Sequence, residues 1–150
     1  TPKPSSAASD VYKRQDTYLI IMIIDNLLLD QVSAKAKASE RLLMNYNFHE
    51  SPDSKAQIML NAMEPRTIIP IACHQTDELF VGLRGALKIT LSDDGKNISL
   101  EQILNPSTGN YGVCIPKGQW HQAEVLEPDT VIFETREGSY MPVTEKDILK

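Results

Sequence analysis

Short apolar runs separated by turn residues recur along the second half of the chain. They are rich in β-branched residues, which favour strands. Asp94-Gly95, between two of these runs, favours a hairpin. Many short strands at close spacing are typical of a sandwich or barrel, and not of a fold in which strands alternate with helices. The predicted strands span residues 67–72, 78–83, 86–91, 98–104, 111–115, 120–126 and 130–135.

The first half of the chain has a different pattern. Residues 18–24 form a continuous apolar run, which predicts a short strand. Asp25 can cap a helix over Asn26–Ala38, because aspartate accepts hydrogen bonds from the first free N–H groups of a helix and the alanines that follow favour helix. Residues 56–63 fit a helix and a strand equally well by period.

We predict one domain in four segments. Residues 1–15 are polar, and their stretch SSAASDVYKRQ resembles translated adapter sequence, so we expect a non-native or disordered leader and a natural start near Met22. Residues 16–66 form an N-terminal arm with a strand, a helix and the first barrel strand. The barrel covers residues 67–142, and residues 143–150 form a C-terminal tail.

Composition narrows the class of protein. The 150 residues are 41% hydrophobic and 23% charged, as in an ordinary globular domain. A net charge of −5 without a basic cluster argues against nucleic-acid binding. No apolar run reaches the roughly 18–20 residues of a membrane helix. Two cysteines, Cys73 and Cys114, are too few for a disulfide scaffold and fit a cytoplasmic protein. We therefore expect neither a nucleic-acid nor a membrane partner.

Three side chains form the main candidate for chemistry. His74 and Glu78 stand four residues apart at the start of a predicted strand, and an even spacing returns both to one face. His121 follows a Pro–Gly turn and begins another predicted strand. Two imidazoles and a carboxylate suit Zn²⁺, Fe²⁺, Mn²⁺ or Ni²⁺. The alternative is a buried His–Glu ion pair without a metal.

The spacings H-x3-E-x6-G and P-x-G-x2-H around these residues resemble the two motifs of the cupin superfamily. The resemblance implies an all-β fold, a single double-stranded β-helix (jelly roll) with an N-terminal strand–helix arm. It also implies one divalent metal ion held by His74, Glu78 and His121. A further ligand histidine of the first motif is replaced by Ala72, so an empty site is the alternative. Cys73 is a poor substitute, since neighbouring strand residues point to opposite faces.

Longer segments are similar to the WbuC-type cupin-fold metalloproteins, a family associated with O-antigen and other bacterial surface-polysaccharide gene clusters. The similar segments are ASERLLMNYNFHES, LNAMEPRTIIP, VGLRG and FETREGSYMP. The resemblance implies that Arg41, Asn45, Asn47 and His49 line the mouth of the barrel and bind ligand. For His49, a hydrogen-bonded loop histidine is the alternative.

Glu134 lies within the last predicted strand. Facing inward it could act as a general base or support another side chain, and facing outward it would be solvated. We expect a cupin-fold metal-binding protein that acts on or binds a sugar or sugar-nucleotide in surface-polysaccharide biosynthesis, and whether it is an enzyme is left open. As an enzyme it would be an isomerase or epimerase in which Glu134 or His49 moves a proton. A non-catalytic carbohydrate-binding cupin with a weakened metal site, and an iron-dependent oxygenase, are the alternatives. A homodimer with a small carbohydrate ligand is expected.

Overall fold

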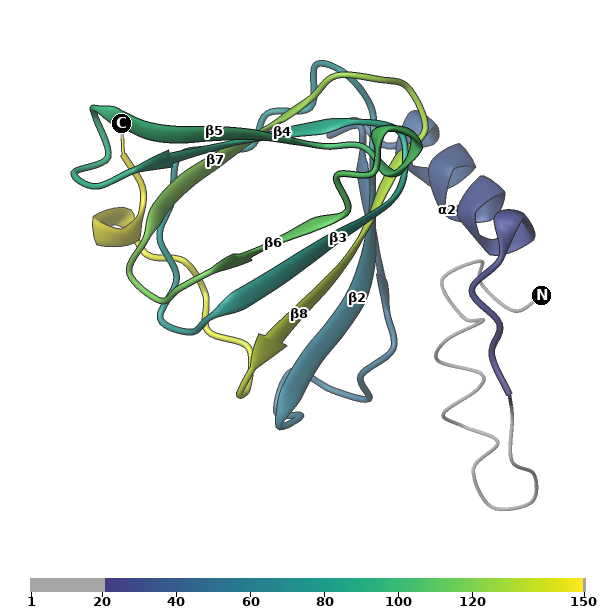
Figure 1. Cartoon of the computed structure of the whole chain (residues 1–150). Coiled ribbons are helices and arrows are strands. Elements are labelled where there is room, and N and C mark those ends of the chain that lie inside the picture. Colours follow the sequence, from purple (N-terminus) through teal and green to yellow (C-terminus); the bar gives the residue numbers. More distant parts are fainter. Residues whose placement is uncertain (1–20, 150) are drawn as a thin grey trace.

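Two antiparallel β-sheets face each other in the computed structural model, which describes residues 21–149 (Figure 1). One sheet has the strand order β1-β2-β8-β3-β6, and the other has the order β5-β4-β7. The prediction of an all-β sandwich or barrel is confirmed. The elements are α2 (Asn26–Ala38), β1 (Leu43–Asn47), β2 (Ala56–Met63), β3 (Glu78–Arg84), β4 (Leu87–Ser92), β5 (Ile98–Leu104), the short 3₁₀ turn η1 (Pro106–Thr108), β6 (Gly112–Ile115), β7 (Trp120–Val125), β8 (Thr130–Glu137) and the 3₁₀ turn η2 (Glu145–Asp147).

Helix α2 has the bounds expected from sequence. The Asp25 side chain accepts a hydrogen bond from the Leu28 N–H at 3.0 Å, which satisfies one free donor of the first turn. The helix lies on the outer face of the five-stranded sheet (Figure 1), where it contacts β1, β2 and β8. Its buried face joins a cluster made of Leu28, Leu29, Val32, Ala36, Tyr46, Leu60, Ala62 and Val131.

The strand predicted at residues 18–24 is wrong over the part that the structure describes. Residues 21–24 have no regular secondary structure, and Ile21 and Ile23 are exposed. A β-type sequence forms a strand only when an edge is available to pair with it. Residues 18–20 and the expected leader, residues 1–15, lie outside the described residues.

The strand predicted at residues 67–72 is also wrong. Only Ala72 pairs, in isolated bridges to His121 and Ile148, because Pro70 has no N–H to donate to a ladder. Residues 56–63, ambiguous in sequence, form β2. The region 16–66 therefore contributes two strands, β1 and β2, to the sheet, where the prediction had one.

Alternation along the strands sorts side chains between the barrel interior and its outside. On β3, Glu78 and Phe80 are buried while the residue between them is less so, and Glu134 is buried on β8. One part of the interior is filled by apolar side chains, so polar ones gather in the remainder. The apolar cluster comprises Met63, Phe80, Leu87, Ile89, Leu104, Ile115, Val125 and Ile132.

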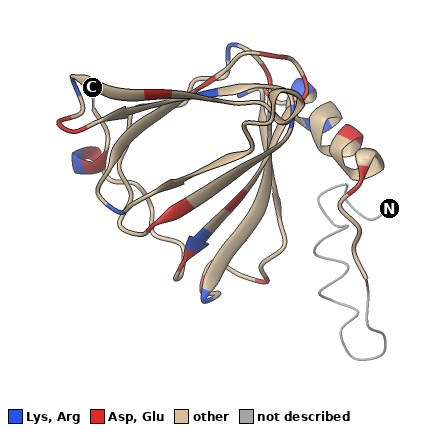
Figure 2. Ribbon diagram, viewed as in Figure 1, with Lys and Arg blue, Asp and Glu red and all other residues tan. Residues whose placement is uncertain are grey.

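Charged residues of both signs are interspersed along the ribbon (Figure 2). Among the described residues, no helix is long and apolar enough to cross a membrane.

Candidate metal centre and cavity

Strand register brings the polar interior residues together. Glu78, the first residue of β3, lies opposite Arg136 of β8, and Phe80 lies opposite Glu134. His121 is the second residue of β7, in the other sheet. The backbones of Ala72 and His121 exchange hydrogen bonds of 3.0 and 2.9 Å, which sets His74 two residues beyond the bridge.

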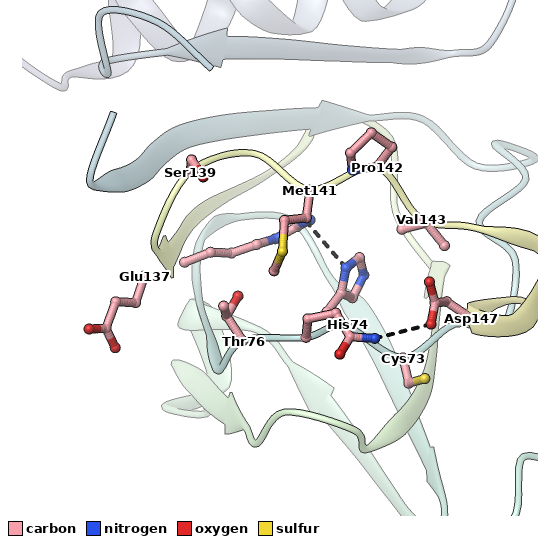
Figure 3. Close-up of a pocket in the computed structure, with 11 residues that line it drawn as sticks. Cys73, His74, Thr76, Glu137, Ser139, Met141, Pro142, Val143 and Asp147 are labelled. Atoms are coloured by element: carbon pink, nitrogen blue, oxygen red, sulfur yellow. Dashed lines mark hydrogen bonds between the residues drawn. The ribbon is translucent and has the colours of Figure 1, made fainter. Parts of the chain in front are cut away.

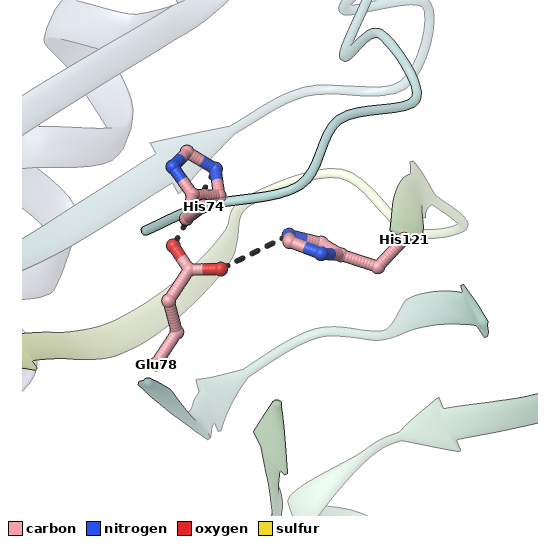
Figure 4. Close-up of side chains that lie close together, drawn as sticks. All are labelled: His74, Glu78 and His121. Atoms are coloured by element: carbon pink, nitrogen blue, oxygen red, sulfur yellow. Dashed lines mark ion pairs between the residues drawn. The ribbon is translucent and has the colours of Figure 1, made fainter. Parts of the chain in front are cut away.

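The imidazoles of His74 and His121 flank the Glu78 carboxylate (Figure 4). His121 Nε2 lies 3.0 Å from Glu78 Oε2, and His74 Nε2 lies 3.6 Å from Oε1. The three ligand atoms lie within 4.8 Å of one another. Two atoms bound about 2.1 Å from one metal ion stand roughly 3.0–3.4 Å apart at octahedral or tetrahedral angles. The observed spacings are close to these values, so the set fits a divalent cation.

Glu78 lies at the buried centre of this group. It is 2% exposed, and its carboxylate oxygens lie 3.0 Å from His121 Nε2 and 2.7 Å from Arg136 Nε. Arg136 Nε donates its proton to Glu134, so that Arg136 stabilises Glu78 through its charge. A cation bound beside the two histidines would act in the same way, because a buried carboxylate needs positive charge next to it.

Burial and neighbouring charges shift the pKa values of Glu78, His74 and His121 in different directions. Burial raises the pKa of Glu78, but His121 and Arg136 beside it outweigh burial, so that the pKa is lowered and the group is a carboxylate. Burial lowers the pKa of His74, and the Arg136 guanidinium adds to this effect against the attraction of Glu78. His74 is therefore neutral.

His121 behaves in the opposite way. Its Nδ1 donates to the Gln119 carbonyl oxygen at 2.9 Å, which orients the ring so that Nε2 faces Glu78. Burial lowers the pKa of His121, but the hydrogen bonds to Glu78 and Gln119 raise it by more. In the metal-free protein His121 therefore keeps its proton to a higher pH than an ordinary histidine, and below this raised pKa a metal ion must displace that proton.

This proton predicts a pH dependence of metal binding. Affinity should rise about tenfold per pH unit below the raised pKa of His121, because one proton is displaced, and should level off above it. Calorimetry in two buffers of different ionisation enthalpy would measure the released proton. An affinity that is constant from about pH 6 to pH 8 would contradict the assignment of His121 as a ligand.

A cavity of about 210 Å³ extends from these residues between the two sheets. Glu134, 4% exposed, lines it and faces inward, so the solvated alternative for this residue is wrong. A chain of hydrogen bonds runs from Asn45 to Asn61 and from Asn61 to Glu134 Oε2. Burial raises the pKa of Glu134 and outweighs the opposing effect of Arg136. The rest of the wall is mainly apolar and includes Met63, Ile68, Ile69, Phe80, Leu87 and Ile132.

The residues expected at the barrel mouth separate into two groups. Arg41 and Asn45 line the 210 Å³ cavity, as Glu134 does. Asn47 and His49 line a neighbouring outer cleft of about 400 Å³, which shares Asn45 and Arg136 with the inner cavity. His49 does not line the inner cavity, because β1 ends at Asn47 and the chain turns away there. Its Nδ1 lies 3.0 Å from both the backbone N and O of Ile58, as in the hydrogen-bonded loop alternative.

On its other side His74 borders a small cavity of about 20 Å³, room for about one water molecule (Figure 3). Residues of the C-terminal segment, among them Ser139, Val143 and Asp147, line this cavity. Cys73 lines it too and is not grouped with His74, Glu78 and His121, the candidate metal-binding set.

Sequence reasoning missed two polar residues of this cavity, Arg136 and Asn61. Extending the alternation from Glu134 by two positions would have placed Arg136 on the inner face of the last strand. Asn61 had no usable signal, because its segment was ambiguous between helix and strand.

Comparison with solved structures shows which fold this is. A cupin superfamily protein from Desulfitobacterium hafniense DCB-2 aligns at 15% identity over 80% of this chain and 95% of that chain, with a TM-score of 0.59. KdgF from a Halomonas species aligns at 16% identity over 65% and 82% of the two chains, with a TM-score of 0.52. A mutant of Bacillus subtilis oxalate decarboxylase aligns at 14% identity over 67% of this chain but only 26% of its own, with a TM-score of 0.51. These likenesses confirm the cupin jelly roll.

No curated protein matches the chain in sequence. A family model described as a domain of unknown function, DUF6016, matches residues 24–104, a span that includes α2, β1–β5 and the candidate ligands His74 and Glu78. Since this match covers more than half of the chain, the protein belongs to the DUF6016 family, and it does so with a cupin fold and a His–Glu–His group suited to a metal ion.

Proposed function

We propose that this protein is a metal-dependent enzyme that moves a proton on a small sugar or sugar-nucleotide, as an isomerase or epimerase does. One observation carries the proposal. The cavity that holds His74, Glu78 and His121 also holds Glu134, a second buried carboxylate that is not among the three ligands. An enzyme of this class needs one group to polarise an oxygen and another to carry the proton.

The residues divide this work between them. A divalent ion bound by the three ligands would polarise a carbonyl or hydroxyl oxygen of the ligand as a Lewis acid. Glu134 would accept the proton from the neighbouring carbon and return it, because its raised pKa brings it closer to neutrality than an ordinary carboxylate. Asn61 donates to one oxygen of Glu134 and Arg136 donates to the other, so the carboxylate is held in one orientation. The apolar wall limits access of water to this proton.

The biological setting belongs to the proposal as well. The segments that resemble WbuC-type proteins support a role in O-antigen or related polysaccharide synthesis. Cys73 and Cys114 are both free, which fits the cytoplasm. Ile98 and Leu100 are exposed on the edge strand β5, which supports a homodimer that covers them.

The test is exchange of substrate hydrogen with solvent. Protein loaded with Zn²⁺, Mn²⁺, Fe²⁺ or Ni²⁺ would be incubated with sugars and sugar-nucleotides in D₂O, and deuterium at the carbon beside the carbonyl would be followed by NMR. Exchange in at least one combination supports the enzyme. Sugar binding without exchange in any combination would instead favour a carbohydrate-binding cupin.

A further inference from the structure

Arg136 occupies a central place that the proposed mechanism only partly uses. It lines the inner metal cavity, the outer cleft and the small cavity beside His74. Its side chain is 22% exposed although it lies among buried carboxylates. The guanidinium therefore stands where a ligand entering from the outer cleft would meet the metal centre.

Without a metal ion, Arg136 contacts Glu78, Glu134 and His74 at once. Its Nε lies 2.7 Å from Glu78 Oε1, and its Nη2 lies 2.6 Å from Glu134 Oε1. Its Nη1 lies 3.4 Å from His74 Nδ1, and because arginine only donates, Nδ1 acts there as the acceptor. A neutral His74 then carries its proton on Nε2, the atom that faces Glu78.

A cation bound by Glu78 and His74 is incompatible with these contacts. Coordination through Nε2 needs the proton of His74 on Nδ1, which then has no lone pair for Arg136. The cation also repels the guanidinium from Glu78. Metal binding would thus release Arg136 from Glu78 and His74 and leave it facing the space that the two larger cavities share.

The charge balance shows what the released group would bind. Glu78 and Glu134 face one guanidinium, so the metal-free cluster carries at most one excess negative charge. A divalent cation reverses this to at least one excess positive charge in a cavity whose wall is mainly apolar. Such a site favours an anion, and a guanidinium can hold a carboxylate or phosphate through two parallel hydrogen bonds.

We propose that Arg136 binds the anionic group, carboxylate or phosphate, of a substrate that extends from the outer cleft into the metal cavity, so that the substrate is an acidic or phosphorylated sugar. This inference rests on the proposed metal site. The outer cleft offers the amide of Asn47 and the ring of Tyr140 to the remainder of such a molecule. These are the side chains that hydrogen-bond hydroxyl groups and pack on sugar faces.

The test compares three probes that share a glucose ring: D-glucuronate, D-glucose 1-phosphate and D-glucose. Binding to metal-loaded and metal-free protein would be measured by calorimetry. We expect one or both anionic sugars to bind the loaded protein about 10- to 100-fold more tightly than glucose, and to lose this advantage without metal. The two anionic probes distinguish a carboxylate from a phosphate.

The variants assign the effect to Arg136. Arg136→Gln should abolish the preference for anions, Arg136→Lys should retain part of it, and Arg84→Gln, a surface arginine paired with Asp30, should leave it unchanged. Metal affinity should rise in Arg136→Gln, because a competing cation is removed, and this readout does not need a sugar. The inference is overturned if metal binds but the loaded protein shows no preference for an anion, or if Arg136→Gln keeps the preference. Failure of the wild type to bind any metal would overturn the proposed function, and this inference with it.

Discussion

Replacing Glu134 with glutamine should slow proton exchange by about 10²- to 10⁴-fold, the usual contribution of a positioned general base. The amide keeps the size of the carboxyl group but cannot accept a proton from carbon. Metal content should stay unchanged, because Glu134 is not among the candidate ligands. The measurement is deuterium incorporation in D₂O, with Glu101→Gln, an exposed carboxyl on β5, as the matched control.

A pH profile separates this role from a structural one. A base must be ionised, so the exchange rate should rise with pH through the raised pKa of Glu134, and this limb should be absent from the residual rate of Glu134→Gln. Glu134→Asp should recover part of the rate. An unchanged rate in Glu134→Gln would remove Glu134 from the mechanism and leave proton transfer without a candidate in the inner cavity.

The sequence predicted those elements whose formation depends on residues close together in the chain. Helix α2 was predicted to the residue, because the Asp25 cap and the alanines act within a few positions of one another. The runs at residues 18–24 and 67–72 have equally strong local preference, yet neither makes a strand among the described residues. A strand needs a partner edge, and no local pattern says where that edge lies.

The same distinction holds for the site. His74, Glu78 and His121 were predicted because each has a short motif around it, and the structure brings them together. Arg136 was missed because its role depends on lying opposite Glu78, 58 positions away in sequence, in the register of β3 and β8. Pairing of this kind is a property of the sheet and cannot be recognised in either strand alone.

The sequence resemblance also did not predict how the ligand-binding candidates are divided between the two cavities. One resemblance grouped Arg41, Asn45, Asn47 and His49 at a single mouth, whereas the structure divides them between an inner cavity and an outer cleft. The division arises where β1 ends, at Asn47, and the sequence analysis predicted no strand there. The residues common to both spaces, Asn45 and Arg136, are therefore the ones whose substitution should affect ligands in both.

Replacing Glu78 with glutamine should weaken metal binding by about 10²- to 10³-fold, or roughly 3–4 kcal/mol, which is the cost of removing one partner from a buried ionic cluster. The fold should survive, because a buried neutral amide is less costly than a buried charge, and Arg136 keeps Glu134 as its partner. Metal affinity would be measured by competition with a chelator, and the melting temperature of the metal-free protein would monitor folding. Glu134→Gln, which alters another buried carboxylate of the same cavity, is the matched control and should bind about one equivalent of metal, as the wild type does.

Ala72→His tests the same metal site by adding a ligand, whereas Glu78→Gln removes one. Ala72 and His121 form a cross-strand pair with reciprocal hydrogen bonds, so their side chains project to the same face of the ladder. A histidine at position 72 would therefore approach the metal from beside His121 and act as a fourth ligand, and affinity should rise about tenfold or more. If Glu78→Gln binds metal as tightly as the wild type and Ala72→His binds no more tightly, the ion does not sit between His74, Glu78 and His121. The buried Glu78 carboxylate would then be stabilised by its ion pairs with His121 and Arg136 alone.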